Sequence, residues 1–552
     1  MKAATIPKVA RAAPTGAGVT PAAPARKRIR LVAWAVVAVF LLLAARAGQL
    51  AVAGDPLAGR DARVAAAALP ERADIVDRNG ELLAATLPGY DLVAEPAKVW
   101  DAPATAKRLA ALFPDLDAAT VERRLLQIDR DLVVLKRDLS PRQRDETFEA
   151  GLAGVSFQPH GRRVYPQGAL AAHVLGAVNA KMSGVAGVES GLDAEILRAG
   201  ALGKPVRLSI DVRIQHALEA ELLQAVAATR AEGGAGVVLA AKTGEVLAMA
   251  SAPDFDPNAP PAPDDGRRLN RAAGAVYEMG SSLKPFTVAM GLDAGVTRTG
   301  EIFDLSKPLP VDGFTVTDFH GLGRPATLAE GFAESSNIMA AEIALRVGAQ
   351  RQRAALRALG LYDRAPIQAP ESARALPPGR ESALSTAVLG YGHGMAFSLT
   401  SLAAAYTVFA NDGARVAPTL LARQSGDPVA RTPVFTPASA HAVVQLMRGV
   451  VETGTGKRAE VAGLDIAGKT GSAEKPRSQG GGYEPDRLFS SFAAVFPASD
   501  PRYVIVVALD EPQRTPETEN LATGGAVAAP VVARIAARIA PLAGMEAKGA
   551  AR

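Results

Sequence analysis

The apolar residues of this 552-residue chain form one isolated segment and, much later, a series of strand and helix patterns. The isolated segment runs from Leu31 to Ala45. From Val206 onward, a strand-like run precedes a helical pattern at 214–228, and two apolar runs joined by a short glycine-containing link predict a hairpin at 235–251. The later predicted elements are strands at 463–467, 489–495 and 503–509 and a closing helix at 526–539.

Strands before and after a mostly helical middle are typical of a sheet with segregated helices, so this pattern predicts an α+β fold. The preceding region, 55–204, differs because it mixes short strands with a charged helical stretch near 104–150. The length of the chain also favours several domains. We therefore expect two folded regions after the apolar segment.

The apolar segment at 31–45 is a candidate membrane anchor. Its residues rise about 1.5 Å each and fall short of a hydrocarbon core of about 30 Å, so a span also requires residues 46–53. The basic cluster ahead of it, at 26–30, places the N-terminus in the cytoplasm and the rest outside. A cleaved signal peptide is the alternative, because 45–47 and 51–53 both fit an A-x-A cleavage site.

The charge of the chain is concentrated at its start. Residues 1–54 contain eight Lys and Arg and no acidic residue, so the net charge of +5 becomes −3 over the remainder. Beyond the N-terminus there is therefore no basic footprint for nucleic acid. The absence of cysteine excludes disulfides, and the six histidines form no H-E-x-x-H motif or close pair, so we expect no metal and no cofactor.

The candidate chemistry begins with Ser281 and Lys284, whose i, i+3 spacing places both side chains on one face of a helix. A serine hydroxyl needs a base within hydrogen-bond reach to act as a nucleophile. Gly280 suits a tight entry into a helix and Pro285 fits only its first turn, so Ser281 is expected near a helix start. Lys284 can be the base if burial and a second cation, for which Lys469 is the candidate, lower its pKa.

Two further motifs follow in the order that serine acyl-transferase sites use. They are Ser335-Ser336-Asn337 and Lys469-Thr470-Gly471. The first motif occurs once, ahead of a helix-like stretch at 338–345, so an N-cap is an alternative interpretation of its serine.

Similar motifs elsewhere in the chain have simpler interpretations. Lys242-Thr243-Gly244 falls in the predicted hairpin turn, and the S-x-x-K run at 472–475 precedes Pro476 and three glycines, which favours a strand end and loop. Residues 463–470 match the phosphate-loop pattern G-x-x-x-x-G-K-T. Gly471 and Pro476 exclude the helix that must follow such a loop, so we do not expect nucleotide binding.

Longer stretches resemble the class B penicillin-binding proteins, the transpeptidases of bacterial cell-wall synthesis, over nearly the whole chain. They are Asn270-Arg271 and Tyr277-Glu278-Met279-Gly280-Ser281 around the nucleophile, and 72–80, 163–166, 173–176 and 187–189 upstream. The runs 314–320 and 334–338 are most similar to the division-specific, FtsI-like branch. Met279 departs from this pattern, because proline is usual there.

The resemblance implies a domain organisation and a location. The domains would be a disordered cytoplasmic tail at 1–28, a transmembrane anchor at 29–53, an elongated non-catalytic pedestal of the dimerisation type at 55–204, a transpeptidase domain with an antiparallel sheet flanked by helices at 205–543, and a tail at 544–552. The protein would lie in the inner membrane with its catalytic domain in the periplasm, at the division septum.

The resemblance also implies a role for each site residue. Ser281 would attack the penultimate D-alanine carbonyl of a pentapeptide stem, and Lys284 would take its proton. Ser335 would pass the proton to the departing amine. The substrate-binding residues would be Asn337 for the substrate amide, Lys469, Thr470 and Gly471 around the terminal carboxylate, and Ser472, whose N–H would form the oxyanion hole with that of Ser281.

The expected partners are the D-Ala-D-Ala donor stem, an amine-bearing acceptor stem that resolves the acyl-enzyme, and β-lactams trapped at the same step. A glycan polymerase and other division proteins would bind in the membrane. The alternatives are an elongation-type transpeptidase, a D,D-carboxypeptidase or β-lactam-hydrolysing enzyme on the same site, and a protein that is mainly a division scaffold.

Overall fold

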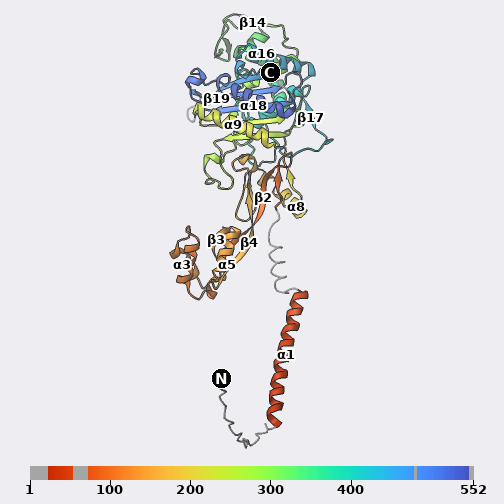
Figure 1. Ribbon diagram of the computed structural model, residues 1–552. Coiled ribbons are helices and arrows are strands. Elements are labelled where there is room, and N and C mark those ends of the chain that lie inside the picture. The colour runs from red at the N-terminus through yellow and green to blue at the C-terminus, as the bar shows by residue number, and fades with distance from the viewer. Residues whose placement is uncertain (1–22, 54–71, 478–481, 546–552) are drawn as a thin grey trace, which may run out of the picture. The chain divides into compact units, whose positions relative to one another are not determined.

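The computed structural model describes residues 23–53, 72–477 and 482–545, which fall into two units, 1–69 and 70–552 (Figure 1). The first unit contains helix α1 (Ala23–Ala53), on which the apolar side chains from Leu31 to Leu43 are exposed. No helix among the described residues reaches the length and hydropathy that a membrane span requires. The predicted tails at 1–28 and 544–552 lie largely outside the described residues.

The second unit begins with a small sheet in which a long strand, β2, pairs with three others. Strand β2 is antiparallel to β1, β3 and β4, and β1 is parallel to β7. The strands are β1 (Ile75–Val76), β2 (Leu82–Ala94), β3 (Val133–Leu139), β4 (Val155–Val164) and β7 (Val206–Arg207). Helices α3 (Ala102–Leu112), α4 (Ala118–Leu125) and α5 (Pro141–Glu149) pack near β2 and β3, where a separate small core includes Leu92, Phe113 and Leu135.

A buried ion cluster lies between this sheet and the helices that follow it, α6 (Ala172–Leu175), α7 (Gly187–Gly191) and α8 (Asp193–Ala201). Glu189 of α7 accepts hydrogen bonds from Arg72 at 2.6 Å and from Arg163 at 2.6 Å. Arg72 also contacts Asp193 at 2.5 Å. The side chains of Arg72, Arg163 and Glu189 are at most 1% exposed, so carboxylates compensate these buried cations directly.

The larger part of the unit is built on a five-stranded antiparallel sheet in the order β18-β19-β20-β8-β9. Its strands are β8 (Gly233–Ala240), β9 (Val246–Ala252), β18 (Ala467–Pro476), β19 (Tyr483–Phe496) and β20 (Tyr503–Asp510). Successive side chains of a strand point to opposite faces. Accordingly, Val504 and Val506 belong to one core and Ile505 and Val507 to another.

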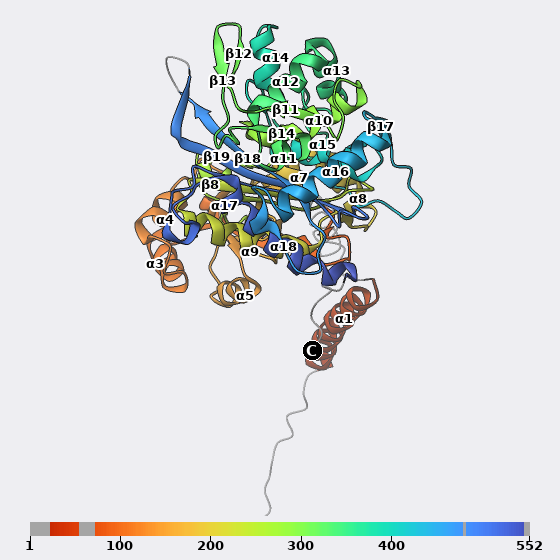
Figure 2. The ribbon, with the colours of Figure 1, turned by 90° about the horizontal axis from the view of Figure 1, so that it is seen from above.

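Helices cover both faces of this sheet (Figure 2). One face carries α9 (Val212–Thr229), α17 (Gly524–Val527) and α18 (Ala529–Ile539). Those of the other layer are α10 (Lys284–Asp293), α11 (Leu328–Ala333), α12 (Asn337–Val347), α13 (Ala349–Ala358), α14 (Ala383–Gly390), α15 (Leu399–Tyr406) and α16 (Pro437–Glu452). The prediction of an α+β fold with an antiparallel sheet flanked by helices is confirmed.

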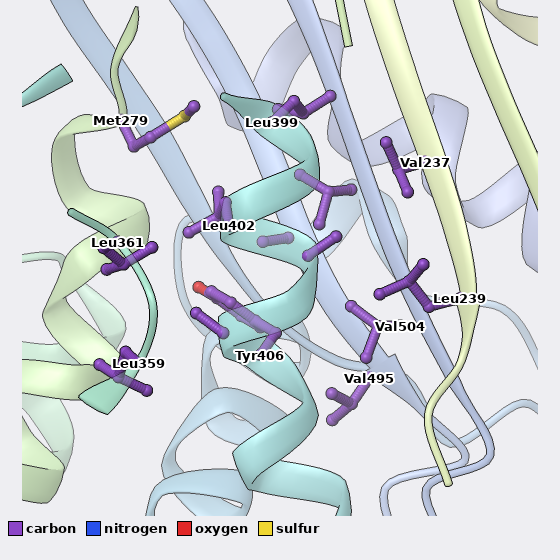
Figure 3. Close-up of a cluster of buried hydrophobic side chains, with 14 of the residues drawn as sticks. Val237, Leu239, Met279, Leu359, Leu361, Leu399, Leu402, Tyr406, Val495 and Val504 are labelled. Carbon is purple, nitrogen blue, oxygen red and sulfur yellow. The ribbon is translucent and has the colours of Figure 1, made fainter. Parts of the chain in front are cut away.

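Within this second layer, helix α15 packs directly against the sheet (Figure 3). All its residues are buried, and Leu399, Leu402 and Tyr406 lie in the same core as Val237 of β8 and Met279. Tyr406 brings a hydroxyl into this core, and that hydroxyl donates to the Ser282 carbonyl at 2.8 Å. The apolar core therefore fixes the backbone directly after the candidate nucleophile.

Several predicted elements are confirmed and three need correction. The hairpin at 235–251 and the helix at 214–228 are confirmed as β8–β9 and α9. The predicted strand at 463–467 is wrong, because β18 begins only at Ala467 and continues through the Lys469 motif and the S-x-x-K run at 472–475. Glycines lower strand propensity, but pairing with the buried β19 holds this segment extended.

The other two corrections concern helices. The charged stretch near 104–150 is interrupted by β3, whose alternate residues Val133, Leu135 and Leu139 are buried. The closing helix at 526–539 is two helices, because Pro530 lacks an N–H and stands in the first turn of a new helix, α18.

Candidate active site

Ser281 lies in a 3₁₀ turn (Gly280–Leu283) that leads directly into α10. Gly280 has φ +52°, a backbone conformation that glycine adopts without steric cost. Its N–H donates to the Gly392 carbonyl at 3.1 Å, and a Cβ at Gly392 would lie 1.8 Å from the Gly280 carbonyl oxygen. The expectation that Ser281 stands at a helix start is confirmed, and the turn is held by close backbone packing.

Lys284, the first residue of α10, is fully buried. Its Nζ donates to the Ser335 carbonyl at 2.5 Å, to the Ser335 hydroxyl at 3.2 Å and to the Asn337 Oδ1 at 2.7 Å. The structure thus joins the first two motifs through one ammonium group. A hydrogen bond from Lys284 to the Ser281 hydroxyl is not among its contacts, and such bonds often form only when substrate is bound.

Ser335 has a positive φ of +63°, which is uncommon for any residue but glycine. The N-cap of α12 is the next residue, Ser336, whose hydroxyl accepts the Met339 N–H at 3.1 Å. The N-cap interpretation of Ser335 is therefore wrong. Its hydroxyl is instead free to contact Lys284 and Lys469.

Lys469 and Thr470 lie on β18, the edge strand of the main sheet. Lys469 is fully buried and its Nζ donates to the Ser335 hydroxyl at 2.8 Å and to Thr470 Oγ1 at 3.2 Å. The Thr470 hydroxyl also contacts that of Thr455 at 2.9 Å. The three motifs thus meet at the Ser335 hydroxyl, which both lysines share.

Gly471, the glycine of the third motif, is required because its surroundings leave no room for a side chain, not because of its backbone conformation. A Cβ at Gly471 would lie 2.4 Å from the hydroxyls of Ser282 and Ser491. These two hydroxyls contact each other at 3.0 Å beneath the strand. The Ser472 hydroxyl accepts the Gly524 N–H at 3.0 Å, so its side chain ties β18 to the start of α17.

Burial sets the pKa values of both lysines. Desolvation lowers the pKa of Lys284 to about 7, against the opposing effect of the Asp318 carboxylate. The pKa of Lys469 is well below its ordinary value, first through desolvation and then through the positive charge of Lys284. Burial and a second cation were both predicted to lower the pKa of Lys284; burial does so, whereas the repulsion between the two lysines lowers the pKa of Lys469.

Sequence reasoning missed two residues that support the site. Asp318 accepts hydrogen bonds from the N-terminus of α12, and Thr455 contacts Thr470. A signal existed for Asp318, which lies in the run 314–320 that resembles the FtsI-like branch. No local pattern marks Thr455.

His393, in the glycine-rich loop beside Gly280, is held by Glu278. Its Nδ1 contacts Glu278 Oε2 at 3.1 Å, and the Glu278 Oε1 accepts the Gly394 N–H at 2.9 Å. Its part is therefore that of a hydrogen-bonded support. The two similar motifs elsewhere in the chain have the predicted structures. Gly244 lies in the β8–β9 turn with φ +74°, and the residues after Lys469 form a strand rather than the helix of a phosphate loop.

The fold and this arrangement define a class of protein, the serine acyl-transferases, in which a lysine of lowered pKa lies one helical turn after the serine. Comparison with known families agrees. The family model described as penicillin-binding protein transpeptidase domain matches residues 234–537, and the model described as penicillin-binding protein dimerisation domain matches 67–196. The chain belongs to the penicillin-binding proteins, as a class B member with both domains.

Similar proteins extend over most of the chain. The probable peptidoglycan D,D-transpeptidase FtsI of Caulobacter vibrioides is 40% identical over 86% of this chain and 82% of its own length. The peptidoglycan D,D-transpeptidase FtsI of Escherichia coli is 29% identical over 84% and 82%. A crystal structure of penicillin-binding protein 3 from Mycobacterium tuberculosis, complexed with aztreonam, matches with a TM-score of 0.67 and 28% identity over 86% of this chain and 97% of that one.

Proposed function

We propose that this chain is the peptidoglycan D,D-transpeptidase of septal cell-wall synthesis, cross-linking stem peptides through a serine acyl-enzyme. The observation that carries the proposal is the buried Lys284, which follows Ser281 by three residues and contacts both Ser335 and Asn337. Its lowered pKa makes it a base at neutral pH. The similarity to FtsI proteins over most of the chain supports the reaction and the role in division.

In the first half-reaction, the Ser281 hydroxyl attacks the carbonyl of the penultimate D-alanine while Lys284 takes its proton. The bond to the terminal D-alanine breaks, an ester forms on Ser281, and the proton passes through the Ser335 hydroxyl to the departing amine. The contact of both lysines with this hydroxyl supports such a relay. In the second half-reaction, an amine of the acceptor stem attacks the ester, the new amide forms, and the proton returns to Ser281.

The remaining site residues bind the donor stem. Lys469, Thr470 and Gly471 face the terminal carboxylate, which restores the charge of Lys469 by pairing with it. Asn337 holds the substrate amide. The N–H groups of Ser281 and Ser472 form the oxyanion hole, a role supported by the close approach of Gly280 to Ser472, since a Cβ at Gly280 would lie 3.0 Å from the Ser472 oxygen.

The domain boundaries 55–204 and 205–543 belong to this proposal. Helix α9 packs on β8 and β9 although it precedes the matched transpeptidase model, which supports a boundary near 205. We assign 29–53 to a membrane anchor, with 1–28 in the cytoplasm and the catalytic domain in the periplasm. The exposed side chains of Leu31, Trp34 and Leu42, each above 70%, support burial in lipid. A glycan polymerase and other division proteins are the expected partners in the membrane.

Intact-mass spectrometry of the full-length protein after incubation with penicillin tests the nucleophile. We expect a stable adduct on the native chain and none on Ser281→Ala, because the β-lactam ring opens on this hydroxyl. Ser282→Ala is the control, because it removes the neighbouring hydroxyl and leaves Ser281 in place, so the adduct should still form. An unmodified native chain would contradict the proposal, and release of the adduct by water rather than by an added amine would favour a hydrolase.

A further inference from the structure

A carboxylate outside the three motifs contacts the second of them. Asp318 follows the hairpin of β12 (Leu309–Val311) and β13 (Phe314–Val316). Its Oδ1 accepts the N–H of Asn337 at 2.6 Å, the N–H of Ile338 at 3.0 Å and the hydroxyl of Ser336 at 3.1 Å. One carboxylate oxygen thus caps the N-terminus of α12, where a negative charge is favoured.

The same segment sets the orientation of the Asn337 amide. The Asn337 Nδ2 donates to the Thr317 carbonyl at 3.0 Å, so Oδ1 is the atom that faces Lys284, at 2.7 Å. Reversing this amide would place an NH₂ group against the ammonium and lose both bonds. Residues 317–318 therefore determine which atoms of Asn337 the site presents.

Asp318 also holds the strained residue of the site. A non-glycine residue with positive φ persists only where its surroundings fix it. Ser335 is followed by Ser336, whose N–H donates to the Gly331 carbonyl at 2.7 Å and whose hydroxyl donates to Asp318. Ser336 is thus fixed from both sides, and Ser335 is kept where its hydroxyl meets both lysines.

The charge of Asp318 acts on the same group. Among the described residues, Asp318 on the segment after β13 is the charged group that acts on the pKa of Lys284, and the charge of Lys284 in turn lowers the pKa of Lys469 on β18. Burial lowers the pKa of Lys284, and the negative charge of Asp318 opposes this effect. The Asp318 carboxylate is linked to Lys284 through Asn337, which donates its N–H to Asp318 and accepts a hydrogen bond from Lys284.

We propose that Asp318 is a positioning residue of the transpeptidase. It fixes the segment 335–337 against Lys284 and supplies the negative charge that balances the two buried lysines. This inference rests on the proposed function, since it assigns Asp318 to the same acylation step.

Two variants of the full-length protein separate the roles of charge and geometry. Asp318→Asn keeps an oxygen that accepts the three hydrogen bonds but removes the charge, whereas Asp318→Ala removes both. Asp312→Asn is the matched control, because Asp312 lies in the turn of the same hairpin and accepts the Leu384 N–H at 3.1 Å. Its φ of +49° suits asparagine as well. The rate of acylation by penicillin is measured from pH 5.5 to 9, with a thermal melt for each variant.

Loss of the charge lowers the pH at which Lys284 becomes neutral, so Asp318→Asn gains rate relative to the native chain as the pH falls. We expect the ratio of variant to native rate to be about threefold higher at pH 6 than at pH 8.5, the effect of about half a pKa unit. Asp318→Ala should lose about tenfold or more at pH 8.5, because a displaced catalytic group costs up to about a hundredfold. Asp312→Asn should match the native protein at every pH.

Uniform slowing of Asp318→Asn with an unchanged pH profile would overturn the inference, because a cap without an electrostatic role gives that result. Native rates in both variants would overturn it as well, while the adduct on Ser281 would leave the proposed function intact. A native chain without an adduct would refute the proposed function instead. If Asp318→Ala fails to fold, the pH profile of Asp318→Asn still decides.

Discussion

Among the described residues, two pairs of buried basic side chains differ in what surrounds them. In the pedestal, Arg72 and Arg163 converge on Glu189, with side chains at most 1% exposed. In the active site, Lys284 and Lys469 converge on a hydroxyl, and both are fully buried. Burial opposes the charge of Arg72, but Glu189 and Asp193 raise its pKa, whereas burial lowers the pKa of both lysines.

The difference follows from the chemistry of the two side chains. Arginine stays protonated at any accessible pH and offers a planar set of donors that matches a carboxylate, so it suits a permanent structural contact. Lysine gives up its proton when buried, so it suits proton transfer. The pedestal thus uses buried charge to fix its fold, and the active site uses it to obtain a base.

The largest expected effect is on the acylation rate, and it comes from replacing a lysine of the active site by arginine, the buried cation of the pedestal. Lys284→Arg keeps a positive charge but cannot accept a proton, so we expect the rate of acylation by penicillin to fall by at least about a thousandfold, as losing a general base typically does. Stopped-flow or mass-spectrometric acylation kinetics measure this. Lys242→Arg, in the β8–β9 turn, is the matched control and should acylate normally. Substantial activity in Lys284→Arg would show that charge alone is sufficient.

The reverse change removes the compensating carboxylate from the pedestal. Glu189→Gln leaves two buried guanidinium groups short of a charge partner, so we expect the free energy of unfolding to fall by about 3 kcal/mol. Asp193 still contacts Arg72 and limits the loss. Chemical denaturation measures the effect, with Glu195→Gln on α8 as the control. A loss no greater than that of the control would mean that packing, not charge, holds this cluster.

The pH dependence of acylation distinguishes the two pairs further. Because Lys284 must be neutral to accept the proton and its pKa is about 7, the acylation rate should rise about tenfold per pH unit below that value and level off above it. Stopped-flow measurements from pH 5 to 9 test this. Glu189→Gln should leave this profile unchanged, since Glu189 is not among the groups that shift the pKa of Lys284. A flat native profile would contradict Lys284 as the base.

The smallest effect is a gain in stability. Lys284→Met removes a buried ammonium, so we expect the free energy of unfolding at pH 7 to rise by about 1 kcal/mol, even though acylation is lost. The unfolded chain holds the lysine proton up to a pKa near 10.4, whereas the folded chain releases it near 7, so native stability rises with pH across this window. The advantage of the variant should therefore shrink toward pH 10. An advantage that grows would contradict the lowered pKa.

Sequence reasoning found the parts of the site that local spacing encodes. The pairing of Ser281 with Lys284 could be predicted from their i, i+3 spacing and from Gly280 and Pro285 beside them, because one helical turn positions all four residues. The fold class could also be predicted from the sequence, because the hairpin at 235–251 and the late strand at 503–509 have clear apolar patterns. The order of the motifs then indicated the chemistry.

Contacts between segments far apart in the sequence could not be predicted from local spacing. The N-terminus of α12 donates to Asp318, which precedes Asn337 by a loop, a short strand and a helix, and the pairing of Arg163 with Glu189 joins a strand to a helix. The strand that carries Lys469 was placed too early, because its glycines and Pro476 obscure the alternation on which strand prediction depends. The strand is defined by its pairing with β19, which local sequence patterns do not show.

The close packing around the nucleophile limits how this protein can evolve. A side chain at Gly392 would collide with the Gly280 backbone, and one at Gly471 would collide with the hydroxyls of Ser282 and Ser491. Substitutions at these positions displace Ser281 for every ligand alike, natural or inhibitory. Changes that alter the response to β-lactams but preserve cross-linking are therefore expected away from these two glycines.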